Sequence, residues 1–207
     1  MEKRKIKGLC MITGLLLFSV FSFITVYYLG TNKYDDQKEE EKIEEFFEEK
    51  EEYVPEITNK EQESKEKETK KVNYTFVIEI PSIGLKKGFY GIGVYSNTVS
   101  QNIQMLNKSD YPDQENGNVM LAAHRGNSKV SFFNKLDKTN NGDKVYLYYN
   151  GVKHEYVLSK RYDIDKTGTA KIVRDYNKNT ITLVTCKKNT NDKQVVYIGY
   201  LNNKTNY

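Results

Sequence analysis

The chain has 207 residues, of which 38% are hydrophobic and 29% are charged, so it is long enough for one domain of ordinary size with appendages. Three prolines and thirteen glycines exclude a collagen-like or proline-rich low-complexity protein. Two cysteines are too few for a disulfide-stapled scaffold, and with only two histidines they limit any metal site. The net charge of +4 combines three unlike segments: residues 1–30 carry +3, residues 31–72 carry −7 and residues 73–207 carry +8. We therefore expect three physically different parts.

Residues 1–30 have the pattern of a basic cytoplasmic tail and a transmembrane anchor. A cationic cluster at residues 3–7 precedes Leu9–Leu29, an uncharged stretch long enough as a helix to cross a hydrocarbon core of ~30 Å. The cationic end stays in the cytoplasm, which places the rest of the chain outside. A cleaved signal peptide is the alternative, but its apolar region is usually about 7–15 residues long and ends in small residues. We expect an uncleaved single-pass anchor in the cell membrane.

Residues 31–72 are rich in Glu and Lys and contain one proline, Pro55. Ile43, Phe46 and Phe47 could line one side of a short helix, but the part after Glu56 has little apolar surface to bury. Such a composition cannot offset the entropy cost of ordering the chain. We expect a solvated acidic stalk that is partly helical before Tyr53.

Residues 73–207 show period-two patterning with β-branched residues, separated by Asn-Gly turn signals. This pattern predicts an all-β domain, a barrel or a sandwich. Two shorter strands are expected within 84–95, and helical patches at 97–106 and 130–136. The main predicted strands are 75–80, 118–124, 144–149, 153–163, 180–186 and 193–201.

One cysteine, Cys186, lies in this domain, at the end of a predicted strand and before a polar stretch. A buried cysteine that acts as a small hydrophobe is the ordinary interpretation. However, cationic neighbours stabilise a thiolate, the nucleophilic form, and two lysines follow Cys186 directly. Another apolar strand ends at His124, so two strands deliver the side chains of a covalent catalytic site. The second histidine, His154, follows a hairpin glycine, and we expect it on the surface.

The order of several short motifs resembles the sortase family, membrane-anchored cysteine transpeptidases of Gram-positive bacteria. The resemblance covers about residues 74–201. It is carried by Ile-Pro-Ser-Ile-Gly-Leu (80–85), Val-Met-Leu-Ala-Ala-His-Arg-Gly (119–126), Phe-Phe-Asn-Lys-Leu (132–136), Gly-Asp-Lys-Val (142–145) and Thr-Leu-Val-Thr-Cys (182–186).

The resemblance implies a closed eight-stranded β-barrel with a few short helices, in which Cys186 is the nucleophile and His124 the general acid/base. The family also uses an arginine at the start of the strand after the cysteine. The matching positions here begin with Lys193, so we expect Lys193 to take that place with a less rigid set of donors. Arg125, Arg161 and Arg174 do not match the motif position.

The implied activity is cleavage of an LPxTG-like sorting signal through a Cys186 thioester and transfer of the secreted protein to an amine of a peptidoglycan precursor. The resemblance implies no cofactor, no metal and no nucleic-acid partner. The missing Asp-Pro-aromatic lid motif and the short stretch 187–192 favour a housekeeping, class A- or D-like enzyme over a pilin-polymerising one. A cysteine hydrolase and a non-catalytic membrane-anchored binding domain are the alternatives.

Overall fold

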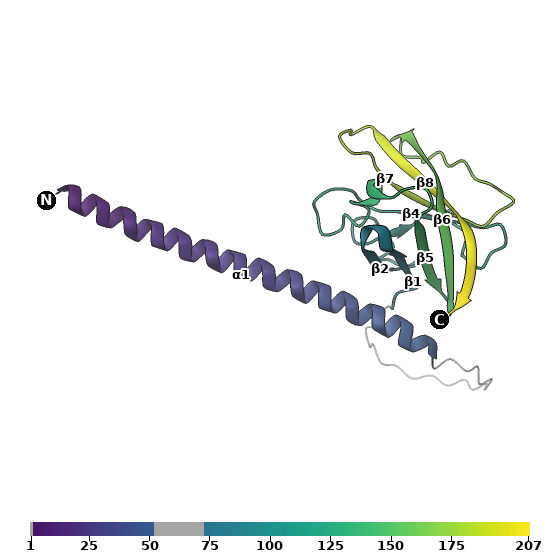
Figure 1. Ribbon diagram of the computed structural model, residues 1–207, viewed down its shortest axis with the longest axis horizontal. Helices are drawn as coiled ribbons and strands as arrows, with labels where there is room; N and C mark the ends of the chain where they lie inside the picture. Colours follow the sequence, from purple (N-terminus) through teal and green to yellow (C-terminus); the bar gives the residue numbers. More distant parts are fainter. Residues whose placement is uncertain (1, 52–72) are drawn as a thin grey trace. The chain divides into compact units, whose positions relative to one another are not determined.

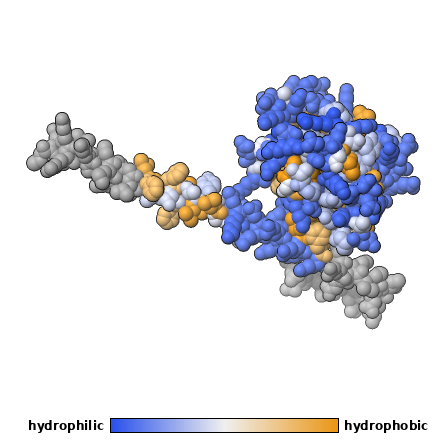
Figure 2. Space-filling view, viewed as in Figure 1, coloured by the Kyte–Doolittle hydropathy of each residue, from blue (hydrophilic) through white to orange (hydrophobic). Residues whose placement is uncertain are grey.

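The computed structural model describes residues 2–51 and 73–207, with side chains for residues 17–48 and 73–207. The chain divides into two compact units, Met1–Glu41 and Lys42–Tyr207. The first unit belongs to helix α1 (Glu2–Glu51), whose large apolar side chains from Leu17 to Leu29 are mostly exposed (Figure 2). Within the described part of the chain, no helix is both long and apolar enough to pass through a membrane.

The predicted anchor Leu9–Leu29 begins among residues whose side chains lie outside the described part. The expected helix at the start of the acidic stalk is confirmed, because α1 continues to Glu51. The remainder of the stalk, residues 52–72, also lies outside the described residues.

The second unit contains a single mixed sheet of eight strands (Figure 1). The strands lie side by side in the order β2-β1-β5-β6-β8-β7-β4-β3. Only β4 and β7 pair in parallel; the other strand pairs are antiparallel. The strands are β1 (Phe76–Ile80), β2 (Leu85–Phe89), β3 (Gln104–Met105), β4 (Asn118–Ala122), β5 (Lys144–Tyr149), β6 (Val152–Asp165), β7 (Thr180–Cys186) and β8 (Lys193–Asn206).

The two edges of this sheet meet, which gives the expected eight-stranded barrel. An isolated bridge joins Tyr90, just after β2, to Gln104 of β3. Closure in this way covers edges that would otherwise offer unpaired backbone groups to another chain. The barrel surrounds a core that includes Phe76, Leu121 and Leu183, all fully buried.

The predicted helical patches at 97–106 and 130–136 are wrong. Turns occupy most of both segments, and the first also contains β3. The only helices of the described barrel residues are the single 3₁₀ turns η1 (Pro81–Ile83) and η2 (Leu136–Lys138). In the first segment, the amide of Asn97 donates to the Met105 carbonyl at 2.8 Å, and its oxygen accepts from the Met105 N–H at 2.7 Å. Asn102 likewise donates to the Gly88 carbonyl at 3.0 Å. These side-chain bonds to the backbone compete with the bonds of a helix.

Candidate active site

The parallel pair β4 and β7 brings the ends of two predicted reactive strands together. Ala122 pairs with Val184, and the N–H of Ala123 donates to the Val184 carbonyl at 3.3 Å. The hydroxyl of Thr185 donates back to the Ala123 carbonyl at 2.9 Å. β4 ends at Ala122 and β7 ends at Cys186, so His124 lies two residues beyond its paired strand. The pairing therefore brings the end of β4 next to β7, with His124 just after one strand and Cys186 at the end of the other.

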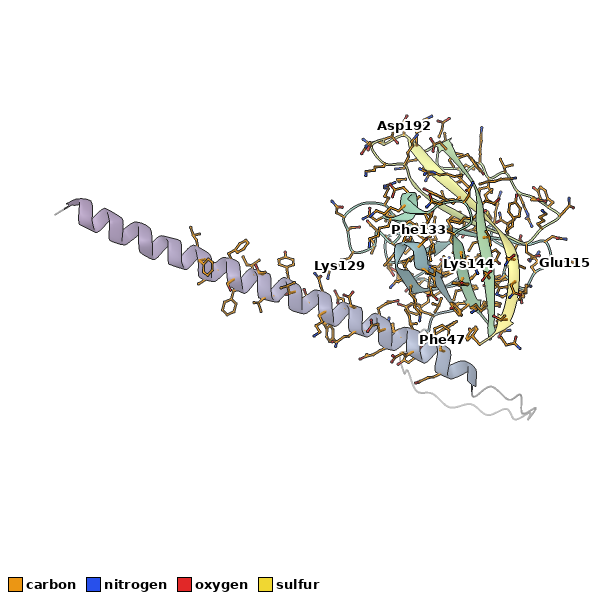
Figure 3. The ribbon with its side chains drawn as sticks, viewed as in Figure 1. Phe47, Glu115, Lys129, Phe133, Lys144 and Asp192 are labelled. Atoms are coloured by element: carbon orange, nitrogen blue, oxygen red, sulfur yellow. The ribbon has the colours of Figure 1, made fainter. Side chains whose placement is uncertain are left out.

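The backbone of His124 is also held from the other side. The N–H of Phe133 donates to the His124 carbonyl at 3.2 Å, and the Phe133 ring is fully buried in the core (Figure 3). The imidazole is exposed, whereas Cys186 is half-buried. A fixed backbone with a free ring suits a group that must exchange protons with substrate.

Alternation along the strands gives β4 and β7 two different faces. Val119, Leu121, Ile181 and Leu183 point into the barrel core. The residues between them point outward, and on β7 this outer row ends at Cys186. The alternation thus separates the residues that stabilise the fold from those that can meet a ligand.

The outer face forms the floor of a groove of about 1040 Å³. Its floor includes Met120, Ala122 and Val184. Asn118 aligns the strands at the far end of this row, because its side-chain oxygen accepts from the hydroxyls of Thr180 at 3.0 Å and Thr182 at 2.8 Å.

The connection between β6 and β7 supplies a wall of this groove, including Ala170 and Ile172. The Arg174 guanidinium fixes this connection by pairing with the Asp110 carboxylate at 2.7 Å and donating to the Asn116 carbonyl at 2.9 Å. The Tyr162 hydroxyl accepts from the Val173 N–H at 2.8 Å. These bonds tie the connection to the barrel at two points.

A second pocket of about 780 Å³ contains Cys186 itself. It shares Lys166 and Asn191 with the groove, so the two hollows adjoin. One carboxylate, that of Asp137, lines this pocket, and the Arg125 guanidinium pairs with it at 2.7 Å and lowers its pKa. The pocket is strongly cationic, because its lining includes Arg125, Lys135, Lys138, Lys166, Lys187 and Lys188.

The third predicted residue, Lys193, is not brought to Cys186. Its ammonium forms an ion pair with Asp165, which raises the pKa of Lys193 and lowers that of Asp165. Lys193 is opposite Lys187, whose N–H donates to its carbonyl at 3.0 Å, and it points to the other face of β8. The register partner of Cys186 is Gln194, which lines the groove. The geometry does not favour the predicted role of Lys193.

The expectation that His154 lies on the surface is wrong. Only 2% of this residue is exposed, because it lies on the same face of β6 as Tyr156 and Leu158, which are buried in the core. Burial lowers the pKa of His154. His154 lies outside both pockets. Among the described residues, no group of His, Cys, Asp and Glu side chains is arranged to hold a metal ion.

Comparison with known proteins identifies the fold and the family. The sequence profile of the Sortase domain matches residues 78–202, more than half of the chain. Sortase A of Bacillus anthracis is 32% identical over 133 residues, which cover 60% of this chain. The chain spans 58% of the length of that relative.

Solved structures of sortases share this fold. Sortase A of Listeria monocytogenes superposes with a TM-score of 0.55 at 24% identity, covering 65% of this chain and 90% of that chain. Sortase C of Streptococcus pneumoniae gives a TM-score of 0.54 at 22% identity, covering 61% of this chain and 65% of that chain. The fold is that of a sortase barrel. The chain belongs to the sortase family, which confirms the resemblance drawn from its motifs.

Sequence reasoning missed the placement of Gln194 and the groove walls. The glycine at position 199 could have indicated the placement of Gln194. Gly199 faces the core, where a Cβ would meet Ile181 at 3.0 Å. Counting back from this fixed position shows that Gln194 lies on the opposite, outer face of β8. No comparable pattern marks Ile172 or Ala170 as groove residues, because their position depends on the folded connection.

Proposed function

We propose that this protein is a cysteine transpeptidase in which Cys186 is the nucleophile and His124 the general acid/base. The observation that supports the proposal is the parallel pairing of β4 and β7: Cys186 ends β7, and His124 follows the last residue of β4 by two positions. A thiol beside an imidazole can open an acyl bond and hold the acyl group as a thioester.

The proposed reaction has two halves. The Cys186 thiolate attacks the carbonyl carbon of a peptide bond, and His124 gives its proton to the amine that leaves. A second amine then attacks the thioester, gives a proton to His124 and releases the thiolate. The thioester retains the acyl group for transfer, so the exchange needs no nucleotide.

The donor substrate is proposed to be an LPxTG-like sorting signal of a secreted protein, bound extended in the groove. The floor residues Met120, Ala122 and Val184 and the wall residue Ile172 offer apolar contacts for the leucine and proline of such a signal. Polar side chains line the groove as well, among them Asn118, Arg174 and Gln194, and can bind the backbone of an extended peptide.

The acceptor amine is proposed to enter through the cationic pocket around Cys186. Because Lys138, Lys166 and Lys188 line this pocket, it favours an amine that carries neighbouring carboxylates, as in an acidic peptidoglycan stem, over a neutral glycine peptide. The pocket lies at the strand end beyond the groove, where an acceptor can approach a bound thioester.

The N-terminal segment is proposed to anchor the enzyme in the cell membrane, with the barrel outside. The support is the uncharged run Leu9–Leu29 after a cationic tail, together with the exposed apolar side chains from Leu17 to Leu29. Confinement of enzyme and membrane-held substrates to one surface raises their effective concentration. The short β7–β8 connection and the missing lid motif favour a housekeeping enzyme of class A or D type.

Amine exchange tests the proposal directly. The full chain is incubated with an LPxTG-type peptide and either triglycine or a stem peptide with a free acidic diamino acid, and the products are identified by mass. We expect a product joined to the added amine, with the acidic acceptor preferred. Hydrolysis without incorporation of any amine would replace the transpeptidase with a cysteine hydrolase. No turnover and no acyl adduct would indicate a binding domain.

A further inference from the structure

We propose that Gln194, in place of the arginine that the family uses, donates the hydrogen bond that stabilises the oxyanion formed at Cys186. This inference rests on the proposed function and goes beyond it, because it assigns a catalytic donor that differs in charge and chemistry from the family's motif residue.

The position of Gln194 follows from the antiparallel pairing of β7 and β8. Cys186 and Gln194 are direct register partners, so their side chains leave the sheet on the same face. The outer-face residues next in line, Val184 and Val196, are also register partners and pack in one buried cluster. That cluster fixes the strand pair up to the residue before Cys186.

The Gln194 side chain is placed so that its amide N–H can donate a hydrogen bond to a bound peptide. Its side chain is half-buried and lines the groove along β4 and β7, which adjoins the Cys186 pocket. Among the described residues, its side-chain amide is not engaged in a hydrogen bond, whereas neighbouring Lys193 is bound to Asp165. Gln194 therefore faces the place where a peptide carbonyl would meet the thiol.

The chemistry requires a donor at this position. When the sulfur–carbon bond forms, the carbonyl electron pair moves to the oxygen, and a preorganised N–H aimed at that oxygen lowers the barrier. The amide of Gln194 can supply this N–H without carrying charge. The electrons return when the carbon–nitrogen bond breaks and His124 protonates the leaving amine.

Two lysines near this site have to be considered as alternative donors to the oxyanion. Lys193 points to the opposite face of β8 and pairs with Asp165. Lys166 borders both hollows, so its ammonium is the alternative donor within reach of the junction. The backbone N–H of Lys166 is bound to the Asp192 carbonyl at 2.7 Å, on the loop labelled in Figure 3. A test must separate Gln194 from both lysines.

The experiment measures the rate of thioester formation by rapid-quench intact mass, with KM from peptide cleavage. The variants of the full chain are Gln194→Leu, Gln194→Arg, Lys193→Ala and Lys166→Ala, with Gln101→Leu as a control at an exposed glutamine. We expect Gln194→Leu to slow acylation roughly 100-fold with KM nearly unchanged, since the lost contact exists only in the transition state. Gln194→Arg should restore the rate, and Lys193→Ala should match the wild type.

The wild type is measured in the same assay. Its thioester formation tests the proposed function, and the Gln194 variants test this inference. If the wild type forms a thioester and Gln194→Leu acylates at the wild-type rate, Gln194 is not the donor although the transpeptidase proposal stands. A large loss in Lys166→Ala or Lys193→Ala, with none in Gln194→Leu, would assign the role to that lysine. A loss in Gln194→Leu that Gln194→Arg fails to reverse would also overturn the inference.

Discussion

The two faces of strands β4 and β7 differ in what they contribute. The inner face, with Leu121 and Leu183, is fully buried and belongs to the core. The outer face, with Met120 and Ala122, is half-buried and forms the groove floor that ends at Cys186. Because consecutive residues alternate between these faces, one short strand serves stability and ligand binding through separate sets of side chains.

The core residues hold the strands that carry the chemistry, and Cys186 and His124 are not part of the core. The inner residues fix the parallel register of β4 and β7; Cys186 ends β7, and His124 follows the last residue of β4 by two positions. Substitutions on the outer face should therefore change rates or affinities, and substitutions on the inner face should change the free energy of unfolding.

Substitution of His124 should give the largest loss of turnover without a loss of stability. His124→Asn should lower turnover by about 10²–10⁴, because proton transfer to the leaving amine is lost. The melting temperature should stay close to that of the wild type, since the imidazole is exposed. Peptide cleavage and thermal melting measure the two quantities, and unchanged turnover would remove His124 from the mechanism.

Adjacent residues of β4 give the sharpest contrast between the faces. Leu121→Ala should cost about 2–5 kcal/mol of unfolding free energy, because it opens a cavity in the core. Met120→Ala should instead raise KM for the sorting peptide with a smaller loss of stability, since Met120 lines the groove. Denaturant unfolding and cleavage kinetics check both. Equal effects of the two substitutions on stability and on KM would contradict the division.

The charge of the pocket around Cys186 should decide which acceptor amine is preferred. Replacing Lys138 and Lys188 together by Glu should reduce transfer to the acidic stem peptide several-fold while leaving transfer to triglycine less affected. The difference between the two acceptors should shrink at high salt, because ions screen exposed charges. An equal loss for both acceptors would show that the pocket charge does not select the amine.

The smallest expected effect concerns His154, which lies away from the groove. Its burial, with Lys204 nearby, lowers its pKa below the ordinary value of 6.5, so the unfolded chain binds the proton more readily. The stability that the neutral ring contributes is complete above pH 6.5 and is lost as the pH falls through the folded pKa. Melting temperatures between pH 7.5 and 5 should fall less in His154→Gln than in the wild type.

The strand pattern made most of the barrel predictable, because alternating β-branched residues mark β4, β7 and β8 directly. The turns at 97–106 were not predictable from periodicity, because the side-chain bonds of Asn97 and Asn102 decide them. His154 was misplaced because its burial depends on which face of β6 closes around the core, the face it shares with Tyr156 and Leu158.

The site was predictable in part. Strand-end positions and the family motifs pointed to Cys186 and His124. The motif position pointed to Lys193, but a difference of one residue along a strand reverses the face, and only the pairing with Cys186 brings Gln194 to the outer side. The groove walls were beyond prediction, because the ion pair of Arg174 with Asp110 sets the path of their connection.

The most direct test of the central claim is to trap the acyl-enzyme. The full chain is mixed with an LPxTG-type peptide, quenched in acid and examined by intact mass and peptide mapping. Our account predicts an added acyl mass on the peptide that contains Cys186, present in Cys10→Ala and absent in Cys186→Ala. An adduct elsewhere, or one that persists in Cys186→Ala, would contradict it.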